Sequence, residues 1–86
     1  MAAITYFVAL PILAGDDGDL YAGEGIEAQS EREARSRASA LAQGHAGAVA
    51  FSRSGDPSTG EYEPAVVLAS YGDLPSDIAD MIGGRP

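Results

Sequence analysis

The chain of 86 residues contains no cysteine, no tryptophan and no lysine, and its only histidine is His45. Without cysteine it cannot form a disulfide, use a thiol nucleophile or build a cysteine-based zinc site. Aromatic residues make up only 7% of the chain, and much of its apolar content is alanine. A short chain of this kind buries a small core. We therefore expect a marginally stable fold that self-association would stabilise further.

Positive charge is also scarce. Five basic residues, all of them arginine, face 13 acidic residues, which gives a net charge of −8. Binding of nucleic acid depends on neutralising phosphates with basic side chains, and anionic membrane surfaces require the same. The composition therefore predicts no nucleic-acid partner and no membrane partner. It is compatible with a basic protein partner, although an acidic surface also serves solubility alone.

The length predicts a single domain over residues 1–82 and a frayed tail over residues 83–86. Residues 2–15 are apolar, but they lack a basic start and Pro11 interrupts them, so we expect no cleaved signal and a cytoplasmic location. Arginine without lysine, together with abundant alanine and glycine, is typical of a GC-rich bacterial genome.

Two strands are expected before the first helix. Residues 4–13 alternate between two faces that are both largely apolar, which is typical of a strand covered on both sides. The backbone hydrogen bonds to the neighbouring strand should be interrupted on one side at Pro11, which has no N–H to donate. Residues 20–29 form a weaker strand, because glycines interrupt it and half of it is polar. We expect a bulge or a sheet edge there.

One clear helix follows. Ser30 and Glu33 have the spacing of a capping box, and Gly44 is expected to end the helix as a left-handed glycine. Glu31–Arg35 and Glu33–Arg37 are favourably oriented pairs one turn apart. An apolar stripe at helical spacing faces a sheet and consists of Ala34, Ala38, Leu41 and Ala42.

A hairpin over residues 48–71 comes next. Asp56, Pro57 and Gly60 have the chemistry of a type I turn that is closed by a left-handed glycine. A plain structural hairpin is the simpler interpretation. The functional interpretation is a partner-binding tip formed by Phe51, Arg53, Asp56, Glu61 and Tyr62.

The resulting fold class is α+β. We expect a four-stranded, mainly antiparallel sheet in the order ββαββ, one amphipathic helix on one face, and a short C-terminal helix over residues 74–82. The chain provides too little helix to cover the second apolar face of the sheet, and exposed patches of this kind mark interfaces. This predicts a homodimer through residues such as Phe7, Ala9, Val67 and Tyr71, or their opposite-face neighbours.

Several patterns that could provide chemistry are weak. Residues 23–28 match a dinucleotide fingerprint, but no full strand precedes them and the helix starts too late. Asp16, Asp17, Asp19 and Glu24 do not fit a calcium loop. His45 is more consistent with a helix-end residue than with a triad using Ser52 or Ser54, and nothing builds a pocket around Glu61 and Glu63. We therefore expect no cofactor, no metal and no catalytic residue.

Two resemblances extend over much of the chain. The hairpin GAVAFSRSGDPSTGEYEPAVVLASYG and the upstream helix EAQSEREARSRASALA resemble a group of short bacterial proteins with no assigned function, which implies a small cytoplasmic protein. HicB-type antitoxins open with a strand, an acidic Asp-Gly turn, a second strand and an Ala-rich helix after a capping Ser or Thr, and residues 4–10, 16–18 and 30–41 resemble that order. The chain departs from the family in two respects. The family's Pro- and Gly-containing segment before the helix is missing, and no DNA-binding region follows.

Three functional hypotheses remain. The first is a small non-enzymatic interaction module that self-associates as a homodimer. The second is an acidic inhibitor, or antitoxin-like partner, of a basic protein. The third is a small enzyme that uses His45 or acidic residues, which a deep polar pocket around His45 would favour.

Overall fold

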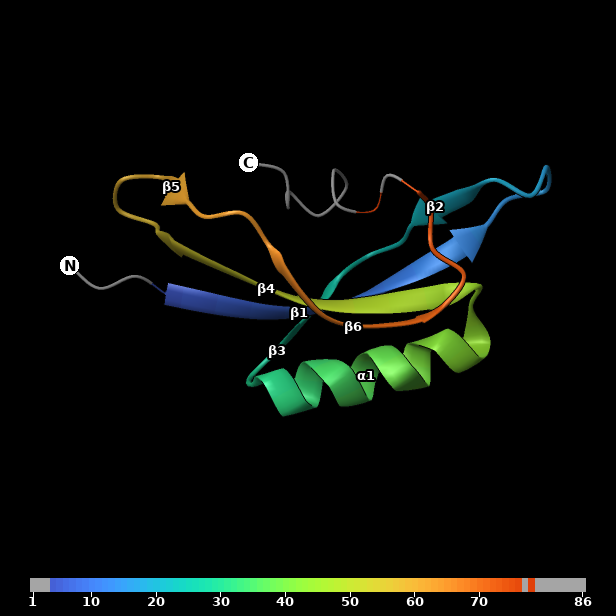
Figure 1. The fold of residues 1–86 in the computed structure, drawn as a ribbon, viewed down its shortest axis with the longest axis horizontal. Coiled ribbons are helices and arrows are strands. Elements are labelled where there is room, and N and C mark those ends of the chain that lie inside the picture. Colours follow the sequence, from blue (N-terminus) through green and yellow to red (C-terminus); the bar gives the residue numbers. More distant parts are fainter. Residues whose placement is uncertain (1–3, 77, 79–86) are drawn as a thin grey trace.

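The computed structural model describes residues 4–76 and residue 78, and it shows an α+β fold with a curled antiparallel sheet and one helix (Figure 1). The elements in chain order are β1 (Ile4–Ala14), β2 (Leu20–Ala22), β3 (Ile26–Ala28), α1 (Glu31–Gly44), β4 (Gly47–Asp56), β5 (Glu61–Tyr62) and β6 (Val66–Gly72).

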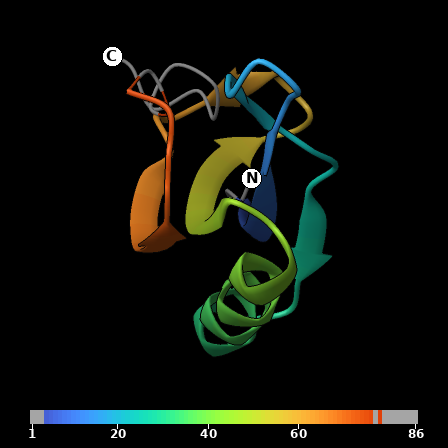
Figure 2. The same cartoon turned by 90° about the vertical axis from the view of Figure 1, so that its right-hand side faces the viewer.

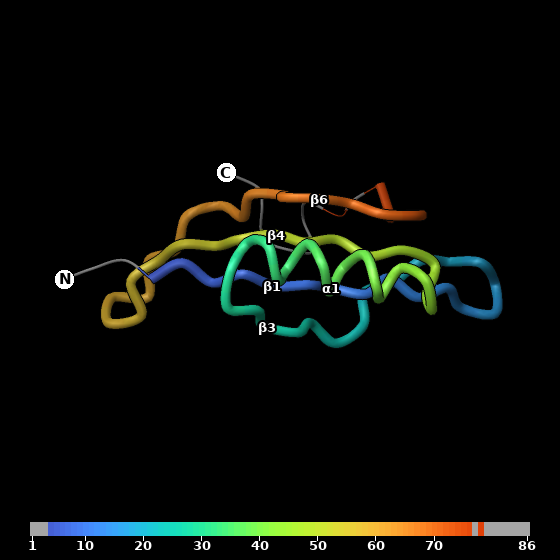
Figure 3. The backbone as a smooth tube through the Cα atoms, turned by 90° about the horizontal axis from the view of Figure 1, so that it is seen from below, coloured from blue at the N-terminus to red at the C-terminus, as the bar shows by residue number. Residues whose placement is uncertain are grey.

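The two long strands β1 and β4 form the centre of the sheet and pair with each other over most of their length. At one edge β2 and β3 both pair with β1, and at the other edge β5 and β6 both pair with β4. Seen from below, α1 lies over the central strands, with β3 and β6 on either side of it (Figure 3). The α+β class predicted from the sequence is therefore confirmed.

The expected number of strands was too low, because each edge is divided into two short strands. Gly23, Glu24 and Gly25 separate β2 from β3, and the gap lies beside Pro11 of β1, which cannot donate a ladder hydrogen bond. The Pro11 carbonyl still accepts a hydrogen bond from the Gly23 N–H, at 2.9 Å. At the other edge Pro64 lies between β5 and β6. The sheet consequently has six strands among the described residues.

The first core lies between α1 and one face of the sheet (Figure 2). The Ser30 hydroxyl accepts a hydrogen bond from the Glu33 N–H, and the Glu33 carboxylate accepts one from the Gln29 N–H, so the capping box is confirmed. Ala34 and Ala38 are fully buried. Their small side chains let α1 approach closely, and the helix is packed mainly on alanines of β1, β3 and β4.

The end of α1 differs from the expectation. Gly44 is the last helical residue, and the C-cap is His45 in an extended conformation with φ −138°. Gly44 is not among the glycines with positive φ. The chain therefore leaves the helix without a left-handed residue. Both predicted ion pairs along the helix are present, with Arg35–Glu31 at 2.8 Å and Arg37–Glu33 at 2.9 Å.

A second core lies on the face of the sheet opposite α1, which we call the helix-free face only because α1 lies on the other side. Its buried members come from alternate positions of the two central strands and are Leu10, Ile12, Val49 and Phe51. Residues from other parts of the chain pack onto them, namely Leu20, Ala22, Ala65, Leu74 and Ile78. The apolar centre of this face is therefore covered within the chain, and the predicted homodimer is not needed to cover it and stays a prediction.

The residues named for that exposed face also lie elsewhere. Phe7, Ala9 and Tyr71 belong to the first core beneath α1, whereas Val67 is 48% exposed. The predicted C-terminal helix and the tail at 83–86 lie largely outside the described residues. In the described part of that segment, the Ile78 N–H donates to the Pro75 carbonyl at 3.2 Å. Leu74 and Ile78 pack onto the second core.

The turn after β4 has the predicted chemistry. The Asp56 carbonyl accepts hydrogen bonds from the N–H groups of Thr59 and Gly60, and its carboxylate accepts two from Ser58, one from the N–H and one from the hydroxyl. Gly60 has φ +76°, so the left-handed glycine is confirmed.

Candidate functional site

The long strands and their turn project beyond α1 at one end of the molecule, where α1 does not cover the sheet (Figures 1 and 3). We call this projection the arm; it comprises residues 4–6 of β1, residues 53–60 and β5. The whole molecule is elongated, with extents of 45 × 24 × 16 Å. Several side chains of the arm are exposed, among them Ile4, Glu61 and Tyr62, so the arm is well placed to meet a partner.

Strand alternation gives the arm two faces of different character. Tyr6 lies opposite Arg53, Ile4 lies opposite Gly55, and Gly55 lies opposite Tyr62. These residues share the helix-free face, and we call the set formed by Ile4, Tyr6, Arg53 and Tyr62 the aromatic face of the arm. Ile4 is 45% exposed and Tyr62 is 41% exposed.

The aromatic face is organised around Arg53. The Arg53 guanidinium carbon lies 5.5 Å from the centre of the Tyr62 ring, which is the distance of a cation–π contact. The Tyr6 and Tyr62 rings are 6.4 Å apart and inclined at 39°. Arg53 Nε is completely buried, and it has no hydrogen-bond partner among the described residues.

Tyr6 is half-buried at the centre of this face. Burial raises the pKa of its hydroxyl above the ordinary value of 10.0, and the neighbouring phenol of Tyr62 and the carboxylate of Glu27 act in the same direction. Glu27 therefore lies close enough to influence Tyr6. It is placed on β3 opposite Val8 of β1, and so on the helix-free face.

The opposite face of the arm is polar. The hydroxyls of Thr5 and Ser54 are hydrogen-bonded at 2.8 Å, and Asp56 lies opposite Glu61 in the register of β4 and β5. At the tip a hollow of about 260 Å³ is lined by Gly55, Asp56, Glu61, Tyr62 and Glu63. The expectation that nothing forms a pocket around Glu61 and Glu63 is therefore wrong, because the turn and β5 bring Gly55, Asp56 and Tyr62 beside them. The hydrogen bonds that Asp56 accepts from the Ser58 hydroxyl and N–H lower the pKa of its carboxyl group.

The structure separates the five residues predicted for the partner-binding tip. Arg53 and Tyr62 are in contact on the aromatic face, whereas Asp56 and Glu61 lie together near the polar face. Phe51 is 9% exposed and belongs to the second core. Sequence reasoning missed Tyr6 and Glu27. The alternation of the first strand marks Tyr6 as a face residue, but only the observed register places it opposite Arg53.

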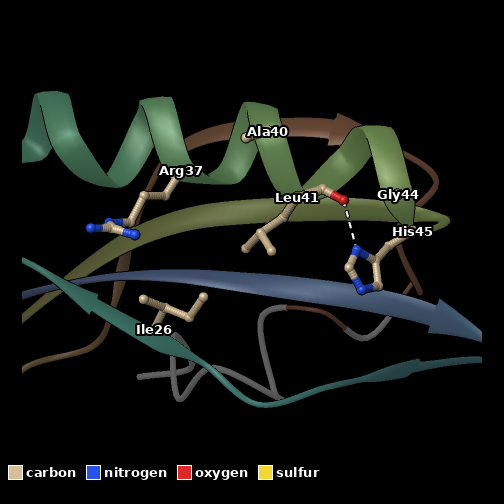
Figure 4. Close-up of a pocket in the computed structure, with 6 residues that line it drawn as sticks. All are labelled: Ile26, Arg37, Ala40, Leu41, Gly44 and His45. Atoms are coloured by element: carbon tan, nitrogen blue, oxygen red, sulfur yellow. Dashed lines mark hydrogen bonds between the residues drawn. The ribbon is translucent and has the colours of Figure 1, made fainter.

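His45 lies at a second hollow, of about 230 Å³, between the end of α1 and β3 (Figure 4). The hollow is lined by Ile26, Arg37, Ala40, Leu41, Gly44 and His45. His45 Nδ1 is 2.7 Å from the Leu41 carbonyl oxygen, and Arg37 is paired with Glu33. No carboxylate or hydroxyl group is among the lining residues. The arrangement fits the helix-end role predicted for this histidine.

The weaker motifs do not assemble into sites. Ser52 lies five residues along β4 from Gly47, a rise of about 17 Å that carries it away from His45. Gly23 and Gly25 lie between two strands, and α1 begins only at Glu31, so they do not present a helix N-terminus to a phosphate. The described part of the chain contains no group of three or more His, Asp or Glu side chains placed to hold a metal ion.

None of the helices in the described ranges has the length and apolarity needed to cross a membrane. Comparisons of the chain with protein-family models, with curated proteins and with solved structures found no match. The functional argument therefore rests on the geometry of the arm and of the two hollows.

Proposed function

We propose that this protein is a small, non-enzymatic interaction module that self-associates through the arm. The observation that carries the proposal is the aromatic face, where Arg53 lies beside two tyrosines on a projection that extends beyond α1 (Figure 1). Tyrosine and arginine are enriched among the residues that contribute most to protein–protein binding. Tyr6 and Tyr62 offer large, rigid contact areas with few rotatable bonds.

The distribution of exposed apolar side chains supports the same surface. Val67 lies opposite Phe51 at the base of the arm, and Val66 lies next to it at the sheet edge. They are 48% and 58% exposed. Val66 lies opposite Ser52 and so faces the other side of the sheet, whereas Ile4, Tyr62 and Val67 place three of the six exposed large apolar residues of the described chain on the face that carries the aromatic side chains. Exposed apolar patches bordered by polar groups are typical of interaction sites.

The aromatic face is small and lies at one end of the molecule (Figure 1), and small interfaces are typical of weak association. We therefore expect a micromolar dissociation constant. A two-fold arrangement is the simplest, since one patch then serves both copies.

Sedimentation equilibrium tests the proposal. We expect a dimer whose population rises between about 1 and 100 μM. Tyr62→Ala should weaken the dimer, because it removes a ring from the aromatic face. Tyr21→Ala is the matched control, since Tyr21 is comparably exposed but lies on β2. The monomer mass at every concentration, or an equal effect of the two substitutions, would contradict self-association through the arm.

A second candidate function has its own observation. The hollow at the tip of the arm is lined by three acidic residues, two of which, Glu61 and Glu63, are exposed. This geometry favours an acidic inhibitor or antitoxin-like partner of a basic protein. A basic protein captured in near-stoichiometric amounts should then be lost with Glu61→Gln/Glu63→Gln and retained with Asp16→Asn/Asp17→Asn, which removes the same charge from the turn after β1.

A further inference from the structure

Arg53 has a hydrogen-bonding requirement that the described residues do not meet. Its Nε is buried beneath the aromatic face, without a hydrogen-bond partner among the described residues. A buried N–H group left without an acceptor destabilises the molecule. The planar guanidinium is suited to a carboxylate, which accepts two parallel hydrogen bonds from it. The contact with Tyr62 provides no hydrogen-bond acceptor, because a ring face attracts the positive charge of the guanidinium but carries no acceptor oxygen.

The carboxylates of Asp56 and Glu61 on the arm are not directed at Arg53. Both ion pairs of the described residues lie along α1 and leave out Arg53. The Asp56 carboxylate accepts its hydrogen bonds from Ser58. Glu61 precedes Tyr62 on β5, and successive side chains of a strand point to opposite faces. Glu61 is therefore directed away from the aromatic face on which Arg53 lies.

One carboxylate does share the face of Arg53. Glu27 lies on β3 and Arg53 on β4, on either side of β1, with Glu27 level with Val8 and Arg53 level with Tyr6. Two strand spacings separate them, about 10 Å. The helix-free face therefore carries an acidic group on one side of its central strand and a basic group on the other, and Tyr6 lies between them.

This arrangement is self-complementary under one symmetry operation. Consider a second copy that faces the first and is related to it by a two-fold axis parallel to β1. This rotation places the β3 side of one sheet opposite the β4 side of the other. The acidic side of each copy then lies opposite the basic side of the other, and the two Tyr6 rings meet near the axis. Arg53 of one copy and Glu27 of the other are then offset by two residues along the strand direction, about 7 Å, which extended arginine and glutamate side chains can span.

We propose that the partner of the aromatic face is a second copy of this chain, seated so that Arg53 of each copy pairs with Glu27 of the other. The inference rests on the proposed self-association and specifies its geometry. It provides a carboxylate for the terminal nitrogens of the guanidinium, since the buried Nε itself is closed to a second copy, and it places both ion pairs beside tyrosine rings that exclude water. It also gives specificity, because a two-fold axis running across the strands instead of along them leaves like charges on the same side of the interface.

Charge reversal and mixing test the pairing. Arg53→Glu alone and Glu27→Arg alone each place like charges opposite one another twice in a homodimer. Each should therefore weaken the dimer by at least about 30-fold. An equimolar mixture of the two variants should form a heterodimer in which both pairs are again of opposite charge. The double variant Arg53→Glu/Glu27→Arg should recover the homodimer. Sedimentation of each sample, with one variant carrying a fluorophore in the mixture, measures these outcomes.

Two controls isolate the pairing from other effects. Arg32→Glu and Glu24→Arg make the same changes in net charge at exposed positions outside the arm, and mixing these two should give no preferential heterodimer. Circular dichroism verifies folding. If a charge reversal prevents folding, Arg53→Gln and Glu27→Gln replace it, and each should weaken the dimer by several-fold.

The outcomes separate the inference from the proposed function. A wild-type monomer overturns both. A wild-type dimer that both charge reversals leave intact, or a mixture that does not recover dimerisation, overturns the Arg53–Glu27 pairing alone. The same holds if Arg53→Glu lowers the unfolding midpoint but leaves the dimer intact, because Arg53 would then be paired within its own chain.

Discussion

Tyr62 packs its ring over the backbone of Gly55, in the space that a side chain at position 55 would occupy. The two residues lie opposite each other in the register of β4 and β5. Because Gly55 has no side chain, the Tyr62 ring can lie close to the sheet and reach the guanidinium of Arg53. The glycine is therefore part of the aromatic face, although it contributes no side chain to it.

Substitution of Gly55 should act through Tyr62. Gly55→Ala should destabilise the protein by about 1–3 kcal/mol, because the new methyl group overlaps the ring. In the background of Tyr62→Ala the same substitution should cost much less, which gives a coupling energy of about 1 kcal/mol or more. Urea unfolding of the wild type, both single variants and the double variant measures the cycle. Additive effects would show that the ring does not occupy this space.

Two glycines with equally open surroundings provide a test of backbone conformation. A side chain at Gly60 or at Gly44 would meet no atom within 4 Å, but only Gly60 has positive φ. Gly60→Ala should destabilise the hairpin by about 1–2 kcal/mol, because an L-residue is strained there. Gly44→Ala should instead stabilise the protein by about 0.4–1 kcal/mol. Thermal unfolding distinguishes the two, and a loss at both positions would contradict the assigned helical conformation of Gly44.

Local chemistry made several parts of the fold predictable from the sequence. The capping box of Ser30 and Glu33, the alanine stripe of α1 and the turn from Asp56 to Gly60 all depend on residues close together in the chain. The two apolar faces of β1 were likewise evident from alternation, and each of them packs in a separate core.

Features set by long-range packing were not predictable in the same way. The second core is closed by Leu20, Ala65, Leu74 and Ile78, which come from three separate segments, and no local pattern indicates that they meet. The candidate site has the same character. Arg53 and Tyr62 stood out within the hairpin, but the position of Tyr6 depends on the pairing of β1 with β4.

The N-cap of α1 should make a measurable contribution to stability. Ser30→Ala removes the hydroxyl that accepts a hydrogen bond from the Glu33 N–H at 3.1 Å, and should cost about 0.5–2 kcal/mol. Ser36→Ala is the matched control, because Ser36 is exposed within the same helix, and its effect should stay within about 0.5 kcal/mol. Equal unfolding midpoints for the two variants in urea would show that Ser30 does not act as a cap.

The capping box should also determine part of the pH dependence of stability. The Gln29 N–H and then the Arg37 side chain bind the Glu33 carboxylate and hold its pKa below the ordinary value of 4.5. A carboxyl group whose pKa is lower in the folded state stabilises the fold above its unfolded pKa, and this contribution is lost as the pH falls through the folded value. Asp17 and Asp56, whose pKa values are lowered by hydrogen bonds from neighbouring groups, contribute in the same direction.

Glu33→Gln should therefore flatten the acid side of the stability curve. The amide oxygen can still accept from the Gln29 N–H, but the side chain no longer titrates, so the unfolding midpoint should fall less steeply than in the wild type between about pH 5 and pH 3. Ser30→Ala is the comparison, since it weakens the same helix end and keeps the carboxylate. It should lower stability at every pH and leave the acid slope in place. Parallel wild-type and Glu33→Gln curves over this range would show that the Glu33 carboxylate does not contribute to the acid sensitivity of the fold.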